Sequence, residues 1–180
     1  DMSEMFNSCS GLKNLDLSSF NTAKVTNMGY MFGGCYDLIS LDLSSFNTAK
    51  VENMTWMFYN CQSLTTIYAS DGFTTGEVSS SDGMFESCFT LEGATPWDIT
   101  KTGIDMANYK DGYFTKSNLT PYVKWDGVNK VLTFKVANNK EEGAYDLNEG
   151  ENKPKWVDEV SGYCTKVVFT PSFKQAKPTS

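Results

Sequence analysis

The chain has 180 residues, of which 40% are hydrophobic and 14% aromatic, enough for the core of one compact domain or two small ones. Its 22 acidic and 15 basic residues give a net charge of −7, which argues against nucleic acid and anionic membrane surfaces as partners. Histidine is absent, so the commonest general base and metal ligand is missing, and no apolar run of ~18 residues is present to cross a bilayer.

The first half of the sequence is repetitive. Residues 5–30 and 31–56 agree at 17 of 26 positions, and both contain the decapeptide LDLSSFNTAK. A third copy starts at Met57 and a fourth at Met84. The copies keep four cysteines at steps of 26, 26 and 27 residues: Cys9, Cys35, Cys61 and Cys88. A period of this length is typical of a solenoid in which each repeat forms one coil and shares its core with its neighbours.

Each repeat is predicted to contain a short strand and a short helix. The Leu-x-x-Leu-Asp-Leu run, at residues 12–17 of the first repeat, alternates apolar and polar residues at its end, as a strand does. Six apolar residues that recur at steps of three and four predict the helix: Val25, Met28, Met31, Phe32, Cys35 and Leu38. Thr26 or Asn27 stands where its N-cap belongs, and Asn53 repeats the position in the next copy. The predicted fold is an α/β solenoid, a leucine-rich-repeat stack of right-handed βα coils with a short parallel sheet, followed by a small mainly-β module.

After Leu91 the repeat pattern decays. We interpret residues 93–116 as a degenerate last coil that caps the exposed face of the array. Residues 1–116 are therefore predicted to form one repeat domain.

The sequence after residue 116 no longer follows the repeat pattern. Residues 117–165 are predicted to form the β module, in which an Asp126-Gly127 turn joins the two strands of a hairpin. Residues 166–180 are expected to start a further repeat, because their FKQAKPTS segment matches FNTAKVTN of the first repeat. Both ends of the sequence then fall within a repeat, and we expect the sequence to be a fragment of a longer array.

The unit N-M-x-x-M-F-x-x-C-x-x-L-x-x-L-D-L-S-S-F-N-T resembles the repeat of the BspA-type leucine-rich-repeat surface proteins of mucosal and oral bacteria. The resemblance covers residues 1–92 and rests on the MF pair, the single cysteine and the LDLSSF run. It implies a secreted, cell-surface location and an adhesive role towards host or extracellular-matrix proteins. It implies no catalytic residue.

The cysteines admit a disulfide ladder, a metal site or buried free thiols, and free thiols are the prediction. Stacked helices would hold equivalent residues roughly 8–10 Å apart, whereas the Cα atoms of a disulfide lie about 4.4–6.8 Å apart. Zinc is not expected without histidine or a CxxC motif, and no cofactor is predicted. Cys164 has no partner in phase and is also expected to be free.

Candidate binding residues lie on two parts of the repeat. Five of them would line the concave face of the predicted sheet: Asp16, Ser18, Asp42, Ser44 and Tyr68. Two aromatic residues, Tyr30 and Trp56, take equivalent positions near the opposite edge. Concave solenoid faces commonly bind partners, and aromatic residues are enriched at binding hot spots. The alternatives are a solvated polar face for the aspartates and ordinary packing for the aromatic pair.

Together these patterns predict a non-catalytic binding module that adheres to host or extracellular-matrix proteins through its repeat faces. The alternative is a structural spacer with no ligand of its own. An enzyme is not expected, because the sequence contains no phosphate loop, nucleophile elbow or HExxH motif. A binding module should carry a non-repeating aromatic or charged patch, whereas a spacer should present only repeating polar residues.

Overall fold

The computed structural model describes residues 1–118, 120–137, 144–146, 164 and 166–169. The chain divides into two compact units, Asp1–Ser117 and Asn118–Ser180. We call the first the repeat unit and the second the C-terminal unit.

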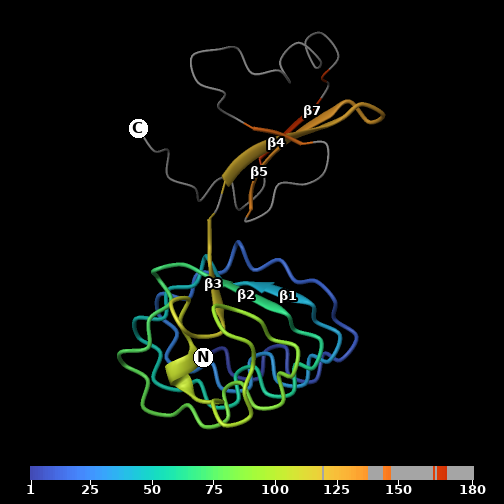
Figure 1. Cartoon of the computed structure of the whole chain (residues 1–180). Coiled ribbons are helices and arrows are strands. Elements are labelled where there is room, and N and C mark those ends of the chain that lie inside the picture. Colours follow the sequence, from blue (N-terminus) through green and yellow to red (C-terminus); the bar gives the residue numbers. More distant parts are fainter. Residues whose placement is uncertain (119, 138–143, 147–163, 165, 170–180) are drawn as a thin grey trace. The chain divides into compact units, whose positions relative to one another are not determined.

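One side of the repeat unit is a parallel sheet of three short strands, which lie side by side in Figure 1. Its order is β1 (Ser40–Asp42), β2 (Thr66–Ala69) and β3 (Phe114–Lys116). Strands β1 and β2 come from successive repeats, and Leu41 pairs with Ile67 in their register. A short 3-10 turn, η1 (Ile104–Met106), precedes β3.

The segment predicted to be helical is a series of turns. Alternate amides in it donate to carbonyl oxygens of the next repeat at 2.8–2.9 Å: Met28 to Asn53, Tyr30 to Thr55, Phe32 to Met57 and Gly34 to Tyr59. Between them, the amides of Met31 and Gly33 donate to carbonyl oxygens three residues back, those of Met28 and Tyr30. The same alternation joins residues 2–8 to 27–33 and residues 54–60 to 80–86. Every second amide of the segment thus links one repeat to the next in register.

The predicted α/β leucine-rich-repeat solenoid is therefore wrong, because the described residues contain small sheets and turns but no α-helix, and so no βα coil. Backbone conformation is the reason. Each repeat has two residues with positive φ four positions apart, such as Tyr30 at 55° and Gly34 at 71°, and left-handed residues interrupt a right-handed helix. Asn27, expected as an N-cap, instead accepts the Gly29 amide at 3.0 Å and opens a turn, and Asn53 does the same.

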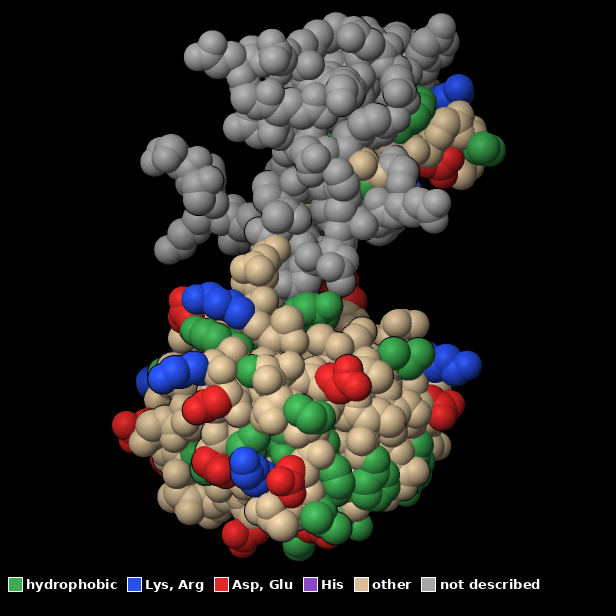
Figure 2. All heavy atoms as spheres, viewed as in Figure 1, with side chains coloured by type: hydrophobic (Ala, Val, Ile, Leu, Met, Phe, Trp, Pro, Cys, Tyr) green, Lys and Arg blue, Asp and Glu red, His purple; other side chains and the backbone are tan. Residues whose placement is uncertain are grey.

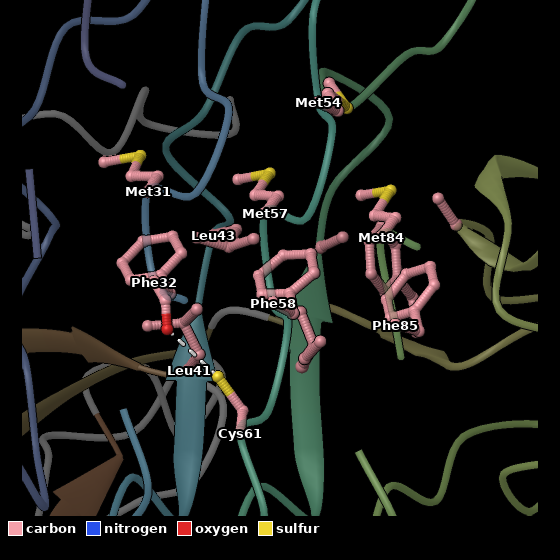
Figure 3. Packing of buried hydrophobic residues seen from close by; sticks show 14 of the residues in the cluster. Met31, Phe32, Leu41, Leu43, Met54, Met57, Phe58, Cys61, Met84 and Phe85 are labelled. Atoms are coloured by element: carbon pink, nitrogen blue, oxygen red, sulfur yellow. Dashed lines mark hydrogen bonds between the residues drawn. The ribbon is translucent and has the colours of Figure 1, made fainter. Parts of the chain in front are cut away.

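Equivalent side chains of successive repeats form rows inside the unit (Figure 3). The rings of Phe32 and Phe58 are stacked with centroids 5.8 Å apart, and those of Phe58 and Phe85 with centroids 5.4 Å apart. A second row consists of three fully buried methionines: Met31, Met57 and Met84. Burial of these rows between layers removes apolar surface from water, and this burial stabilises the stack.

Two buried threonines add side-chain links between repeats. Thr22 and Thr48 are each 1% exposed. The Thr48 hydroxyl donates to the Thr74 carbonyl oxygen at 2.6 Å and accepts the Thr74 amide at 2.7 Å. Thr22 makes the same pair of hydrogen bonds with Asn47. Each hydroxyl is satisfied as donor and as acceptor, which offsets the cost of burying it.

Residues 93–116 cover the C-terminal end of the phenylalanine row. The rings of Tyr113 and Phe114 stand edge-on to Phe85, at 5.3 and 6.0 Å between centroids. The Trp97 indole donates to the Phe85 carbonyl oxygen at 2.8 Å. Strand β3, which contains Phe114, extends the sheet beside β2. The last phenylalanine of the row is thereby in contact with rings and a strand of the cap as well as with Phe58.

The C-terminal unit contains a sheet of four strands in the order β6-β4-β5-β7. They are β4 (Thr120–Asp126), β5 (Val131–Ala137), β6 (Tyr145–Asp146) and β7 (Lys166–Phe169). The predicted hairpin is confirmed, since β4 and β5 pair antiparallel around the turn that follows Asp126. Strand β7 pairs with β5, so these four residues, expected to begin a further repeat, belong to this sheet. Residues 170–180 lie outside the described part of the chain.

Candidate functional site

The five candidate residues of the strand face take part in strand pairing and in turns. Asp42 and Tyr68 are direct partners across β1 and β2, and both are partly exposed. The Asp42 carboxylate accepts the Ser44 amide at 2.9 Å and the Ser44 hydroxyl. Asp16 accepts the Ser18 amide at 2.9 Å in the same way. Each aspartate therefore stabilises the turn that follows it, which in the case of Asp42 comes directly after β1. The role of both in binding stays a prediction.

The other two candidates, Tyr30 and Trp56, lie against each other. Their ring centroids are 4.8 Å apart and the ring planes are tilted by 55°. Tyr59 extends the group, with its centroid 6.2 Å from that of Trp56. We call these three partly exposed residues the aromatic ridge. Glu4, just before the first repeat, and Gly83, at the end of the third, take the position of Tyr30 and Trp56, so the ridge is confined to the middle of the stack.

Polar groups of the ridge are free to bind outside partners. Within the described part of the chain, neither the Trp56 indole N–H nor the hydroxyls of Tyr30 and Tyr59 make a hydrogen bond. A side-chain carbon at Gly83 would lie 2.3 Å from Trp56 Nε1 and 2.9 Å from Glu86 Oε2. The indole edge and this carboxylate therefore both pack against Gly83, where any larger residue would collide with them.

The five cysteines are free, as predicted. Three of them are buried, and each thiol donates to the carbonyl oxygen of a phenylalanine in the preceding repeat. Figure 3 shows the hydrogen bond of Cys61 to Phe32, at 3.1 Å. Cys35 donates to Phe6 at 3.2 Å and Cys88 to Phe58 at 3.0 Å. Burial raises the pKa of Cys35 to about 11 and that of Cys88 to about 12, and it raises the pKa of Cys61 as well. Such thiols are poor nucleophiles, because the reactive species is the thiolate. Cys9 is exposed, contrary to the prediction that all four repeat cysteines are buried.

A polar cluster beside the cap was not predicted from the sequence. The Tyr109 hydroxyl donates to the Asp71 carboxylate, and the Lys116 ammonium lies 3.5 Å from that carboxylate and 5.0 Å from the Tyr109 ring centroid. The hydrogen bond from Tyr109, and then the charge of Lys116, lower the pKa of Asp71. A hollow of about 320 Å³, lined in part by Phe73 and Tyr109, lies next to this cluster. A lowered pKa keeps Asp71 ionised, which suits an ion pair better than a general acid.

The sequence of the repeat unit matches one protein family. Residues 1–118, about two thirds of the chain, match the family described as Mycoplasma protein of unknown function, DUF285. The chain belongs to this family. No curated protein and no solved structure matches it.

The described part of this DUF285 chain has no helix with the length and apolar character needed to cross a membrane. Nor do three or more Asp, Glu or Cys side chains gather there into a group that could hold a metal ion.

Sequence reasoning did not single out Tyr59 or Glu86. Both occupy the same position of successive repeats, where the first two repeats have Asn7 and Gly33. The change at this position, from small or polar residues to an aromatic ring and then a carboxylate, was the one sequence feature that could have indicated them. Its meaning depends on the turn conformation, which brings this position next to that of Trp56.

Proposed function

We propose that the DUF285 repeat unit is a non-catalytic, extracellular binding module of a bacterial surface protein, and that it adheres to host or extracellular-matrix proteins. Membership of a Mycoplasma family supports a bacterial origin. The resemblance of residues 1–92 to BspA-type surface proteins supports the cell surface as its location. The single observation that carries the proposal is the aromatic ridge, a non-repeating patch on a repeating scaffold.

The contrast between scaffold and ridge favours binding over a spacer role. LDLSSFNTAK is identical in the first two repeats, where it serves turns and burial and, in the second, strand pairing. The position of Tyr30 and Trp56 changes in every repeat, from Glu4 through both aromatic residues to Gly83. Tyrosine and tryptophan offer large, stiff contact surfaces with a polar tip, the properties of binding hot spots.

Capture of extracellular-matrix proteins on the immobilised full chain tests this function. The informative variant is Trp56→Gly, because Trp56 has a φ of 53° and glycine already occupies the same position at Gly83 with a φ of 57°. Phe89→Ala is the matched control, since it removes a ring outside the ridge that is 56% exposed. We expect the wild type and the control to capture the same proteins and Trp56→Gly to lose them. Capture by none of the three would instead support the spacer.

A further inference from the structure

We propose that the aromatic ridge recognises a positively charged side chain, above all arginine, on an extended segment of its protein partner. This inference rests on the proposed binding function and specifies the chemistry that the partner must present. Aromatic rings attract cations through the negative faces of their π-systems, and tryptophan does so most strongly.

The ring geometry suits a cation. Trp56 is tilted by 55° against Tyr30 and by 53° against Tyr59, with centroids 4.8 and 6.2 Å away. Rings in such tilted contact do not cover each other completely, and a cation can lie on a ring face that the protein leaves uncovered, within about 6 Å of its centroid. All three rings are partly exposed, so their faces are not fully used by the core.

Negative charge surrounds the ridge. Glu86 borders the Trp56 indole, and the Trp56 amide donates to the carbonyl oxygen of Asp82 at 2.9 Å, which places that residue beside the ridge as well. Both acidic residues are exposed, and neither forms an ion pair with any residue that the structure describes. A cation bound on the rings would therefore also meet the uncompensated Glu86 carboxylate, with Asp82 as a second acidic residue nearby.

The charge of the whole repeat unit acts in the same direction. Residues 1–117 carry 14 acidic and 6 basic side chains, a net charge of −8. Acidic side chains are spread over the face of this unit shown in Figure 2. Such a field attracts cationic segments and repels anionic ones during encounter. A neutral ligand would gain neither from this field nor from the Glu86 carboxylate.

Arginine fits better than lysine for a geometric reason. Its guanidinium is planar, so it stacks on an aromatic face and still directs paired N–H donors towards a carboxylate. The arrangement of Trp56 beside Glu86 offers both kinds of contact.

A pair of peptides separates charge from shape. One fluorescein-labelled peptide contains three Gly-Ser-Arg units, and the other has citrulline, which keeps the shape but not the charge, in place of each arginine. Fluorescence anisotropy with the full chain should show binding of the arginine peptide and none of the citrulline peptide. Trp56→Gly should weaken the binding about tenfold, within the range of cation–π energies.

Matched charge variants separate local recognition from diffuse attraction. Glu86→Gln should weaken binding of the arginine peptide roughly threefold. Glu92→Gln is the control, because it removes the same charge at an exposed residue outside the ridge, whose amide donates to Thr65 next to the start of β2. It should leave the affinity for the arginine peptide within about twofold of that of the wild type. Tyr59→Ala, at a position without positive φ, repeats the ring test should Trp56→Gly fail to fold.

Three results would overturn the inference: no binding of the arginine peptide, equal binding of the citrulline peptide, or equal losses from Glu86→Gln and Glu92→Gln. The proposed function fails separately. Ridge-dependent capture of matrix proteins without arginine-peptide binding removes only the cation preference. Absence of any capture removes the adhesive function, and the peptide data then describe a site without that role.

Discussion

Replacing one ring of the phenylalanine row tests how the repeats are held together. Phe58 is fully buried, stacks on Phe32 and Phe85 and meets the edge of Phe114 at 6.4 Å. A buried Phe→Ala change costs about 3–5 kcal/mol, and the loss of two stacked partners places Phe58→Ala near the upper end of that range. A unit of this size has a free energy of unfolding on the order of 5–15 kcal/mol, so much of its stability would be lost.

Hydrogen exchange of the full chain measures this effect in the repeat unit itself. Peptides that cover residues 28–61 should exchange much faster in Phe58→Ala, in proportion to the lower free energy of opening. Phe89→Ala serves as the control, because Phe89 is 56% exposed and keeps one edge contact with Trp97, so its change should be about 1 kcal/mol or less. Equal exchange in the two variants would refute the stacked row as the core of the unit.

Three further predictions follow from single contacts. Thr48→Val should lower the free energy of unfolding by about 2–4 kcal/mol, because it leaves the Thr74 amide and carbonyl unpaired, whereas Thr48→Ser should change it little in urea titrations. Asp42→Ala should lower the free energy of unfolding by about 1 kcal/mol, because its turn hydrogen bonds are lost, but it should leave matrix-protein capture unchanged. Loss of capture in this variant would indicate that the binding site lies on the strand face. Above pH 9 the free energy of unfolding should fall, because burial holds the pKa of Cys88 at about 12 while the unfolded thiol ionises near 9. The contribution of the Cys88 thiol to stability is complete below the pKa of the unfolded state and is lost as the pH rises towards the pKa of the folded state. Urea titrations should therefore show a shallower decline of stability with pH in Cys88→Ala. An unchanged decline would contradict the role given to Cys88.

The repeat period carried much information about packing and little about backbone conformation. Equal spacing predicted that residues such as Phe32 and Phe58 stack on each other, and their rings do. The same spacing predicted a helix, because apolar residues three and four apart share one face of a helix and also one face of a series of turns. The left-handed residues that decide between the two include Tyr30 and Trp56, types that rarely adopt positive φ, so no residue signal marked them.

The candidate site was predictable only where it followed the period. Tyr30 and Trp56 are equivalent in the repeat, and register alone predicts that they are neighbours. Tyr59 and Glu86 reach the same surface through the turn conformation, which the sequence did not reveal. The cluster of Asp71 with the cap depends on a contact between residues 38 positions apart and outside the repeat phase.

The Trp56 indole provides the most direct test of the account. Its N–H makes no hydrogen bond within the described residues, and Trp56→Gly identifies its signal among those of the four tryptophans in an NMR spectrum of the full chain. Addition of a captured matrix protein should shift or broaden this signal and leave that of Trp97, which is bonded inside the cap, unchanged. An unchanged Trp56 signal, with shifts at Asp42 and Tyr68 instead, would contradict binding through the aromatic ridge.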